Sequence, residues 1–463
     1  MRTAALTAGL ALTLALCFAS VSRPLHADEF AFHEVGARAA ALGGAFTGKA
    51  DDITAIFYNP AGLAFLKGLR LKTDLMLSGR TVSAYAPAYN MTFKTNPGVY
   101  LQNIFLAWQP VKRIGLGVGY FSPYNYKSKW ESWWWIGDEV SCAANLKSNF
   151  FRSVLSIEVL KGLSVGAALD VVSLSAEWHH MVPFEPSNYA LPNEAKALSH
   201  HMLKGNGLGF TAGALWKVFP ALQVGARYQT NVPVNLAGAN TFGFSLDYNY
   251  DSVPDPYQPV RSVSSLLDMF YVSQSVTGKM TLPRVIACGV ALTPFPWLSL
   301  YLDLQWDRWS ELGSWEFRSV NTDENLSPEF TPVYQEFWGI SPNYGTQGAA
   351  LTLQDSRKFK AGLEFRPGRW FAVRAGFARN ETSVGSADLS PLYPDLDRNV
   401  FSIGGGYEGP VYSTYEDEII GQLSFDLFFR YSSAIGSPST FPGLEMTYSD
   451  KGWSAGVGVG FNF

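Results

Sequence analysis

The chain has 463 residues, of which 47% are hydrophobic, 15% aromatic and only 16% charged. Average soluble domains carry about 25% charged residues, so this chain has too few to solvate an ordinary surface. A formal net charge of -4 gives no indication of nucleic-acid binding, and three cysteines are too few for a disulfide framework.

Residues 1–27 have the pattern of a secretory signal peptide. Arg2 precedes a long apolar run, Pro24 follows it, and "LHA" places a small residue before Asp28, where the mature chain would begin. Losing the two arginines of this leader changes the formal charge from -4 to -6. An uncleaved anchor helix is an alternative that Pro24 and the small residues oppose. Lipidation at Cys17 is another, which the bulky residue before it fits poorly.

After the leader, no uncharged apolar run approaches the ~20 residues of a membrane-spanning helix. An exported chain of this composition therefore favours a β-barrel in an outer membrane. The C-terminal segment "GWSAGVGVGFNF" alternates as a lipid-facing strand should, and "LSLYLDLQW" and "QLSFDLFFRY" repeat the pattern. In the C-terminal segment one face carries Trp453, Ala455, Val457, Val459, Phe461 and Phe463.

Fourteen such segments are predicted along the chain. They are residues 67–86, 97–110, 113–127, 147–160, 162–179, 203–219, 221–235, 279–294, 297–312, 355–366, 369–382, 398–409, 420–432 and 452–463.

The connections between these segments alternate in length. After even-numbered segments they are mostly tight turns: "PVKR", "LKG", "FPA", "PFPW" and "RPGR". After odd-numbered segments they are long, above all 235–279 and 312–355. Tight turns at one end, long loops at the other and an even strand count are typical of an outer-membrane barrel. The prediction is an all-β fold, a 14-stranded antiparallel transmembrane β-barrel over residues 67–463, with both ends of the barrel in the periplasm.

Residues 28–66 precede the first strand and are too apolar for a free tail. "GARAAALGGAFTGKADD" predicts a short, closely packed helix, and the acidic pair before "ITAIFYNPAGL" predicts a further helical turn. The roomy cavity that a barrel of this size offers is its own lumen. The prediction is a partly helical N-terminal hatch inside the barrel.

The sequence resembles the FadL/TodX family of outer-membrane transporters for long-chain fatty acids and hydrocarbons. The resemblance begins at "GARAAALGGAFTGKADDITAIFYNPAGLAFLKG" and resumes at "IGLGVGYFSPYNYKSKW", "GNGLGFTAGALWKVFPALQVGARYQTNVPV" and "LPRVIACGVALTPFPWLSLYLDLQWDRWSEL". It ends with "LYPDLDRNVFSIGGGYE" and Phe463. The Asn-Pro-Ala turn is among its most specific features.

The resemblance implies a hatch-gated, passive path for hydrophobic molecules from outside into the barrel, with sideways exit into the membrane lipid near the hatch. The family's hatch motif falls on Asn59, Pro60 and Ala61, whereas its ligand-binding side chains match no motif here. Phe463 resembles the aromatic end by which the barrel-insertion machinery recognises its clients. The residues expected to form the gating turn are Phe57, Tyr58, Asn59, Pro60, Ala61 and Gly62.

If the apolar positions face lipid, the strands point charged side chains of both signs into the lumen. One interpretation is that these side chains form salt bridges that stiffen the barrel and hold the hatch. A sharper hypothesis is that one or two of Arg227, Lys360, Arg374 and Arg430 bind a fatty-acid carboxylate. The inward set is Arg152, Glu158, Asp170, Arg227, Asp303, Asp307, Lys358, Lys360, Glu364, Arg374, Asp426 and Arg430.

Two other features are ambiguous. The aromatic stretch 124–139 fits either a membrane-interface girdle or a landing site for amphipathic ligands. The pairs at 179–180 and 200–201 are histidines that could meet across strands, but without supporting ligands they are better interpreted as surface histidines than as a zinc site. Cys142 and Cys288 are given no catalytic role, and no cofactor is expected.

Two other function classes are alternatives. A barrel lipase or protease would need a nucleophile with a positioned base, and the sequence has no Gly-x-Ser-x-Gly motif, so no enzyme is predicted. A structural or adhesion barrel that binds proteins through the long loops remains the alternative to a fatty-acid channel. The sequence leaves the identity of the carried molecule open.

Overall fold

The computed structural model describes most of the chain. The described ranges are 34–95, 98–130, 141–183, 196–244, 274–312, 315–320, 346–349, 353–389, 394–412, 419–439 and 445–463. No helix within these ranges is long and apolar enough to cross a membrane. The predicted signal peptide, residues 1–27, lies outside them, as does most of the stretches 235–279 and 312–355.

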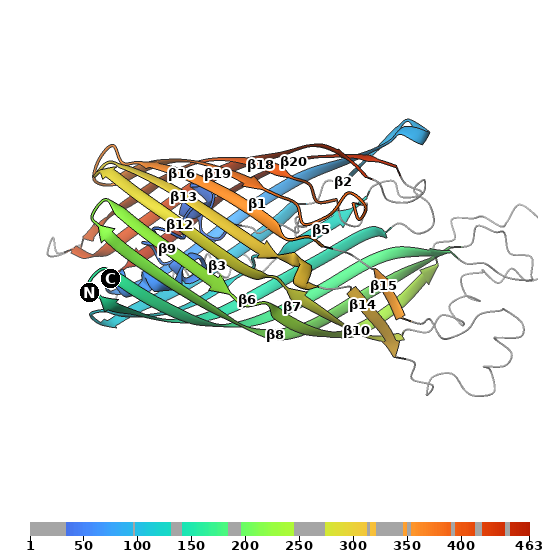
Figure 1. Cartoon of the computed structure of the whole chain (residues 1–463), viewed down its shortest axis with the longest axis horizontal. Helices are drawn as coiled ribbons and strands as arrows, with labels where there is room; N and C mark the ends of the chain where they lie inside the picture. Colours follow the sequence, from blue (N-terminus) through green and yellow to red (C-terminus); the bar gives the residue numbers. More distant parts are fainter. Residues whose placement is uncertain are drawn as a thin grey trace, which may run out of the picture.

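The strands form one closed antiparallel barrel (Figure 1). Six pairs of consecutive strands lie end to end, so that the twenty strands make fourteen staves, and β1 pairs with β20 to close the sheet. The prediction of a 14-stranded barrel is confirmed. The strands are β1 (Leu69–Ala86), β2 (Met91–Thr95), β3 (Gly98–Val111), β4 (Ile114–Phe121), β5 (Asn125–Lys129), β6 (Ser141–Leu160), β7 (Leu163–Pro183), β8 (Lys196–Phe219), β9 (Leu222–Gln229), β10 (Val232–Phe244), β11 (Gln274–Leu282), β12 (Arg284–Phe295), β13 (Leu298–Arg308), β14 (Trp315–Val320), β15 (Thr346–Ala349), β16 (Ser356–Phe365), β17 (Phe371–Asn380), β18 (Arg398–Tyr412), β19 (Ile419–Pro438) and β20 (Thr447–Asn462).

Alternation along the strands separates an outer apolar face from an inner face. On β13, Leu302 and Leu304 point outward and are exposed, whereas Asp303 and Gln305 point inward and are buried. Eleven of the twelve side chains predicted to face the lumen are buried. The exception, Glu158, ends β6 and accepts a hydrogen bond from the backbone N–H of Gly162 in the adjoining turn.

Tight connections gather at one end of the barrel, which we call the short-turn end; the opposite end is the long-loop end (Figure 1). The strands run further toward the long-loop end than the sequence predicted. β8 begins at Lys196 rather than 203, and β10 continues to Phe244 rather than ending at 235. The outward positions of these extensions include His200, Ala237 and Thr241, so an apolar outer face could not reveal them.

Residues 34–66, here called the hatch segment, lie inside the barrel at the short-turn end (Figure 1). The predicted helix and the predicted helical turn are both present. They are α2 (Ala37–Ala41), then α3 (Ala55–Tyr58) and the 3-10 helix η1 (Pro60–Phe65). Two further 3-10 turns, η2 (Pro87–Tyr89) and η4 (Trp309–Leu312), lie in the barrel. The hatch segment is almost wholly buried, so its apolar side chains avoid water.

Candidate functional site

The Asn-Pro-Ala turn fixes the hatch segment to the wall. The Asn59 side-chain oxygen accepts from Ala61 N–H at 3.2 Å and caps η1, while its Nδ2 donates to the carbonyls of Thr47 (3.1 Å) and Ala214 (2.9 Å). The wall leaves room for it at Gly213, where a Cβ would stand 2.2 Å from Asn59 Oδ1. Asn59 is therefore a buried anchor between two parts of the hatch segment and β8.

Two arginines of the barrel wall donate hydrogen bonds to backbone carbonyl groups just before the Asn-Pro-Ala turn. Arg152 on β6 donates to the carbonyls of Ile56 (3.2 Å) and Phe57 (3.1 Å), and Arg227 on β9 donates to Phe57 at 2.7 Å. The guanidinium of Arg152 is fully buried and also pairs with Asp170 and Gln229. Phe57 is thus fixed at its backbone, and its ring lies against the Arg227 guanidinium, 5.2 Å from centroid to Cζ.

Carboxylates of the barrel wall accept hydrogen bonds from backbone N–H groups of the hatch segment. Asp303 Oδ2 accepts from the backbone of Phe46 (2.9 Å) and Thr47 (2.7 Å), and Asp74 Oδ1 accepts from Ala37 at 2.9 Å. Charge-assisted hydrogen bonds of this kind are stronger than neutral ones. The wall therefore binds the hatch backbone through side chains of both signs.

Ion pairs form a network beneath the hatch segment, toward the short-turn end. Glu364 accepts from Arg38 of the hatch (3.1 Å) and from Arg374 (2.7 Å). Arg374 also reaches Asp426 at 2.7 Å, and Asp426 accepts from Lys72 at 2.8 Å. These contacts match the interpretation of the lumenal charges as salt bridges.

The four basic residues proposed as carboxylate ligands differ in their partners. Arg374 pairs with Glu364 and Asp426, Arg227 donates to Phe57, and Lys360 Nζ lies 2.9 Å from Glu34 Oε1. Arg430 Nε has no hydrogen-bond partner within the described ranges, although its side chain is buried. Arg227 Nε likewise lacks a partner within the described ranges, so Arg227 and Arg430 are the members of the set with unused hydrogen-bonding capacity.

Glu34 joins the hatch segment to two of these cations. Its Oε2 accepts from the Tyr58 hydroxyl at 2.7 Å. Burial alone would raise the pKa of the Glu34 carboxyl, but Lys360 and Arg430 outweigh burial and hold that pKa below its ordinary value. Burial and Glu34 raise the pKa of Tyr58 well above its usual range, so the hydroxyl remains a donor.

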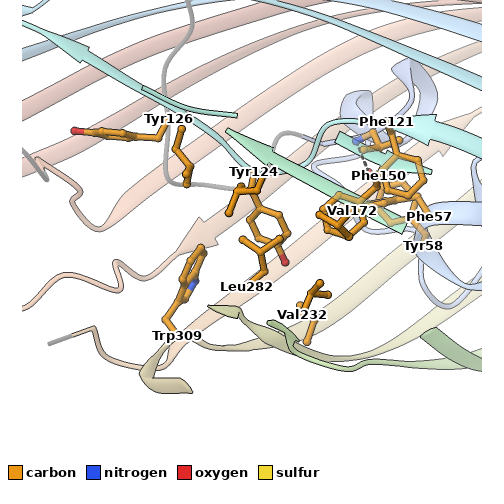
Figure 2. Close-up of a cluster of buried hydrophobic side chains, with 14 of the residues drawn as sticks. Phe57, Tyr58, Phe121, Tyr124, Tyr126, Phe150, Val172, Val232, Leu282 and Trp309 are labelled. Carbon is orange, nitrogen blue, oxygen red and sulfur yellow. Dashed lines mark hydrogen bonds between the residues drawn. The ribbon is translucent and has the colours of Figure 1, made fainter. Parts of the chain in front are cut away.

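A continuous apolar surface covers one side of the lumen above the hatch segment, toward the long-loop end. Figure 2 shows part of it, from Trp309 past Leu282 and Tyr124 to Val172 and Phe57. We call this surface the apolar wall. Its members are Tyr126, Leu146, Phe150, Val172, Leu174, Leu203, Val232, Val234, Leu236, Val276, Met280, Leu282 and Trp309.

Aromatic rings connect the apolar wall to the hatch segment. The Tyr124 ring lies 5.8 Å from Trp309 and 5.9 Å from Phe150, measured between centroids. Phe150 stacks on Phe121 at 5.8 Å, and Phe121 meets Phe57 of the hatch at 5.1 Å. An apolar molecule that followed these rings would meet apolar and aromatic side chains from Trp309 to Phe57.

The barrel wall is incompletely paired beside this path. β3 pairs with β1 over its full length to Gly98, but it pairs with β4 only as far as Ile104. β5 pairs with β6, and beyond it a single bridge joins Thr95 to Trp130. Within the described ranges, residues 99–101 and 103 therefore pair with β1 but have no strand partner on the β4 side. We call residues 99–101 and 103 the unpaired wall stretch.

Proline explains where the unpaired wall stretch begins. Pro123 separates β4 from β5 and has no N–H to donate to a neighbouring strand. Phe121 and Phe105 lie at its edge on the lumen side, both fully buried. The stretch therefore adjoins the point where the aromatic rings reach the hatch.

A small polar cavity lies on the other side of the hatch segment, at the short-turn end. Its lining combines hatch residues with the ends of β1 and of the last strands, including Arg38, Asp51, Lys72, Arg374 and Asp426. Because its lining is charged, this cavity suits water and ions rather than an apolar molecule.

The histidine pairs lie near the long-loop end of β7 and β8. Residues 179 and 200 are directly opposite in the strand register. His200 Nε2 lies 2.9 Å from Glu177, and His201 stacks on Trp178 at 4.9 Å. Within the described ranges no group of three or more potential metal ligands occurs, and Cys288 is an exposed free thiol on the outer face.

Sequence reasoning placed Arg152 in the lumen but assigned it no specific contact. It included Tyr124 only within the candidate landing stretch 124–139, and it did not single out Glu34. Their partners lie far away along the chain, so no local pattern could indicate them. A signal for the unpaired wall stretch was present, because "FSPYN" puts Pro123 inside a predicted strand.

The fold and the lumen together define a closed transmembrane β-barrel with an internal plug and a cluster of buried apolar side chains beside it, the architecture of a class of membrane channel. The family model described as "Outer membrane protein transport protein (OMPP1/FadL/TodX)" matches residues 18–463, and the chain belongs to this family. The predicted family is confirmed.

Solved structures share the fold at low sequence identity. A Pseudomonas aeruginosa FadL homologue is 17% identical, with a TM-score of 0.72 over 95% of this chain and all of its own. The Pseudomonas putida toluene transporter TodX is 14% identical, with a TM-score of 0.68 over 93% of this chain and 99% of its own. The Ralstonia pickettii toluene transporter TbuX is 14% identical, with a TM-score of 0.65 over 94% of this chain and all of its own. No curated protein matches the sequence.

Proposed function

We propose that this chain is an outer-membrane channel that takes up long-chain fatty acids or similar hydrophobic molecules by passive diffusion. A molecule enters at the long-loop end, which faces outward, and moves along the apolar wall to Phe57. It leaves sideways through the unpaired wall stretch into the membrane lipid. No chemical step is involved, so the chain acts as a channel and not as an enzyme.

One observation carries this proposal: the aromatic path ends beside the one stretch of β3 that lacks a partner strand on that side within the described ranges. Apolar surface lowers the free energy of an apolar solute by roughly 25 cal/mol per Å² removed from water. A route that passes from the apolar wall directly into lipid keeps the solute away from water. The charged cavity below the hatch would require it to enter water again.

The hatch segment is proposed to gate this path. Phe57, Tyr58 and the turn Asn59–Gly62 stand at its end, and their backbone is held by Arg152 and Arg227. The same proposal places residues 1–27 as a cleaved signal peptide, both ends of the barrel in the periplasm, and Phe463 as the signal to the barrel-insertion machinery. These assignments agree with the positions of the hatch segment and of the end of β20, which both lie at the short-turn end of the barrel.

Uptake by liposomes containing the purified barrel tests the proposal. Labelled laurate should enter vesicles with the native chain faster than empty vesicles. Pro123→Thr, which restores an N–H and a strand-forming side chain, should slow uptake at least about threefold by favouring a closed wall. Asn90→Asp, in the η2 turn far from the wall stretch, serves as the matched surface control. Equal uptake by empty and loaded vesicles would contradict the channel assignment.

A further inference from the structure

The Glu34 side chain places its carboxylate among groups inside the lumen that bind carboxylates. Its oxygens contact Lys360 Nζ at 2.9 Å and the Tyr58 hydroxyl at 2.7 Å, and it is 5% exposed. The hatch turn makes space for the group at Gly44, where a Cβ would stand 2.2 Å from the Glu34 carboxyl carbon. Gly44 has a φ of +79°, which a residue with a side chain rarely adopts.

Unsatisfied polar groups lie in the wall near Glu34. Arg430 on β19 is directly opposite Ser402 on β18 and Ser454 on β20. All three side chains are buried, and neither Arg430 Nε nor Ser402 Oγ has a hydrogen-bond partner within the described ranges. Buried polar atoms without partners are costly, and they indicate a ligand or a water that would satisfy them.

The row formed by Ser402, Arg430 and Ser454 lies on the long-loop side of the hatch. Two residues closer to the short-turn end on the same strand, Phe428 packs against Ala37, Ala40 and Ala41 of α2. Asp426 lies beyond Phe428 and belongs to the ion-pair network beneath the hatch. Arg430 therefore lies on the long-loop side of α2, the side from which a ligand would arrive under the proposed function.

Tyr58 connects this polar row with the end of the aromatic path. Its hydroxyl donates to Glu34, and its ring meets Phe57 at 4.9 Å and Phe46 at 5.5 Å. A molecule whose tail lies along the aromatic path would bring its other end to the place that Glu34 now holds.

We propose that the Glu34 carboxylate is an internal stand-in for the carboxylate of the transported molecule. An incoming carboxylate would compete with Glu34 for Lys360 and Arg430, and its arrival would release the hatch from Tyr58 and Lys360. The substrate class is then a single-chain amphiphile with one carboxylate head rather than a neutral hydrocarbon. This inference rests on the proposed function, because it assumes that substrates reach the hatch through the lumen.

Calorimetric titration in non-ionic detergent micelles with decanoate and with decan-1-ol tests this inference, with empty micelles as the reference. The two probes have the same chain and differ in the charge of the head. Glu34→Gln keeps the shape of the side chain but removes the competing charge, so the ratio of decanoate to decanol affinity should rise about tenfold. Arg430→Gln should lower that ratio by about tenfold through loss of charge-assisted hydrogen bonds.

Gly368→Ala is the control, since a Cβ there meets nothing within 4 Å and no charge changes. It should leave both affinities and their ratio unchanged. If Arg430→Gln fails to fold, Ser402→Ala provides the second test, with the ratio expected to fall about threefold. A Glu34→Gln variant whose ratio stays the same or falls would overturn the inference.

Uptake measurements separate this inference from the proposed function. If vesicles carrying the native chain take up decanol and decanoate while every variant keeps the native affinity ratio, the stand-in role is wrong and the channel remains. If the vesicles take up neither probe faster than empty ones, the proposed function fails as well.

Discussion

The two sides of the lumen differ in what they contact. The apolar wall, on β5 to β11 and η4, presents aliphatic and aromatic side chains to the space above the hatch segment. The opposite wall, on β13, β16, β17, β19 and β1, presents charges that bind the hatch and one another, such as Glu364, Arg374 and Asp426. The charged side chains thus bind the hatch, whereas the apolar side chains of the other side pack on one another.

The proposed gating requires a hatch that is both stably bound and displaceable, and this difference bears on both. Hydrogen bonds to charged groups depend on particular distances, as between Arg227 and the Phe57 carbonyl at 2.7 Å, so a small shift weakens them. Apolar contacts tolerate sliding because they have no preferred direction. The charged groups, which include Arg152 and Arg227, therefore set the position of the hatch, and the apolar side chains set the proposed path.

The largest effect is expected at Arg152. Arg152→Met removes the cation that joins Asp170, Gln229 and two hatch carbonyls, and it leaves Asp170 buried without its partner. Breaking a buried pair in this way should cost about 3 kcal/mol or more of unfolding free energy. Urea unfolding of the barrel in liposomes measures it.

The double variant Arg152→Met with Asp170→Leu is the control for that prediction. Because it removes both charges, it should recover a substantial part of the loss. A single variant as stable as the native chain would show that the charged contacts do not hold the hatch.

A charge placed on the apolar wall should block the path. Val172 on β7 is fully buried in this wall, and Val172→Lys would put an ammonium group among apolar side chains. Because an unpaired charge there is strongly unfavourable and attracts water, laurate uptake should fall at least about tenfold. Val172→Ile, which adds volume without charge, is the comparison. Equal uptake by both variants would argue against a path along this wall.

A smaller effect is expected where the wall makes room for the hatch. Gly213→Ala would place a Cβ 2.2 Å from Asn59 Oδ1 and 2.9 Å from Pro60 Cδ. Overpacking of this kind costs about 1–3 kcal/mol, so the hatch should become more sensitive to protease. Gly368→Ala is a matched control, because a Cβ there meets nothing within 4 Å. The same protease sensitivity in both variants would contradict the assigned anchor.

The smallest effect concerns pH. Since the folded pKa of Glu34 lies below its ordinary value, its contribution to hatch docking is present above that ordinary value and is lost as the pH falls through the folded pKa. The protection factors of the hatch amides against hydrogen exchange should therefore fall as the pH drops below the ordinary carboxyl pKa of about 4. Glu34→Gln should show a weaker pH dependence in that range, and an unchanged profile would remove Glu34 from the account.

The sequence predicted the barrel well because lipid and lumen impose opposite demands on alternate residues. This contrast located fourteen staves and the inward side of residues such as Asp303 and Arg430. It failed where the outer face is no longer apolar, at the long-loop ends of β8 and β10. The contacts of the site were not predictable, because pairs such as Arg38 with Glu364 depend on three-dimensional register across 326 residues.

Photo-crosslinking tests the central claim most directly. A long-chain fatty acid with a diazirine at the end of its tail would be bound to the native barrel in liposomes, irradiated and mapped by mass spectrometry. Sideways exit predicts adducts at Tyr124, Phe150 and Phe121 and along the unpaired wall stretch. Adducts concentrated instead in the charged cavity below the hatch, at residues such as Ile53 and Trp370, would contradict it.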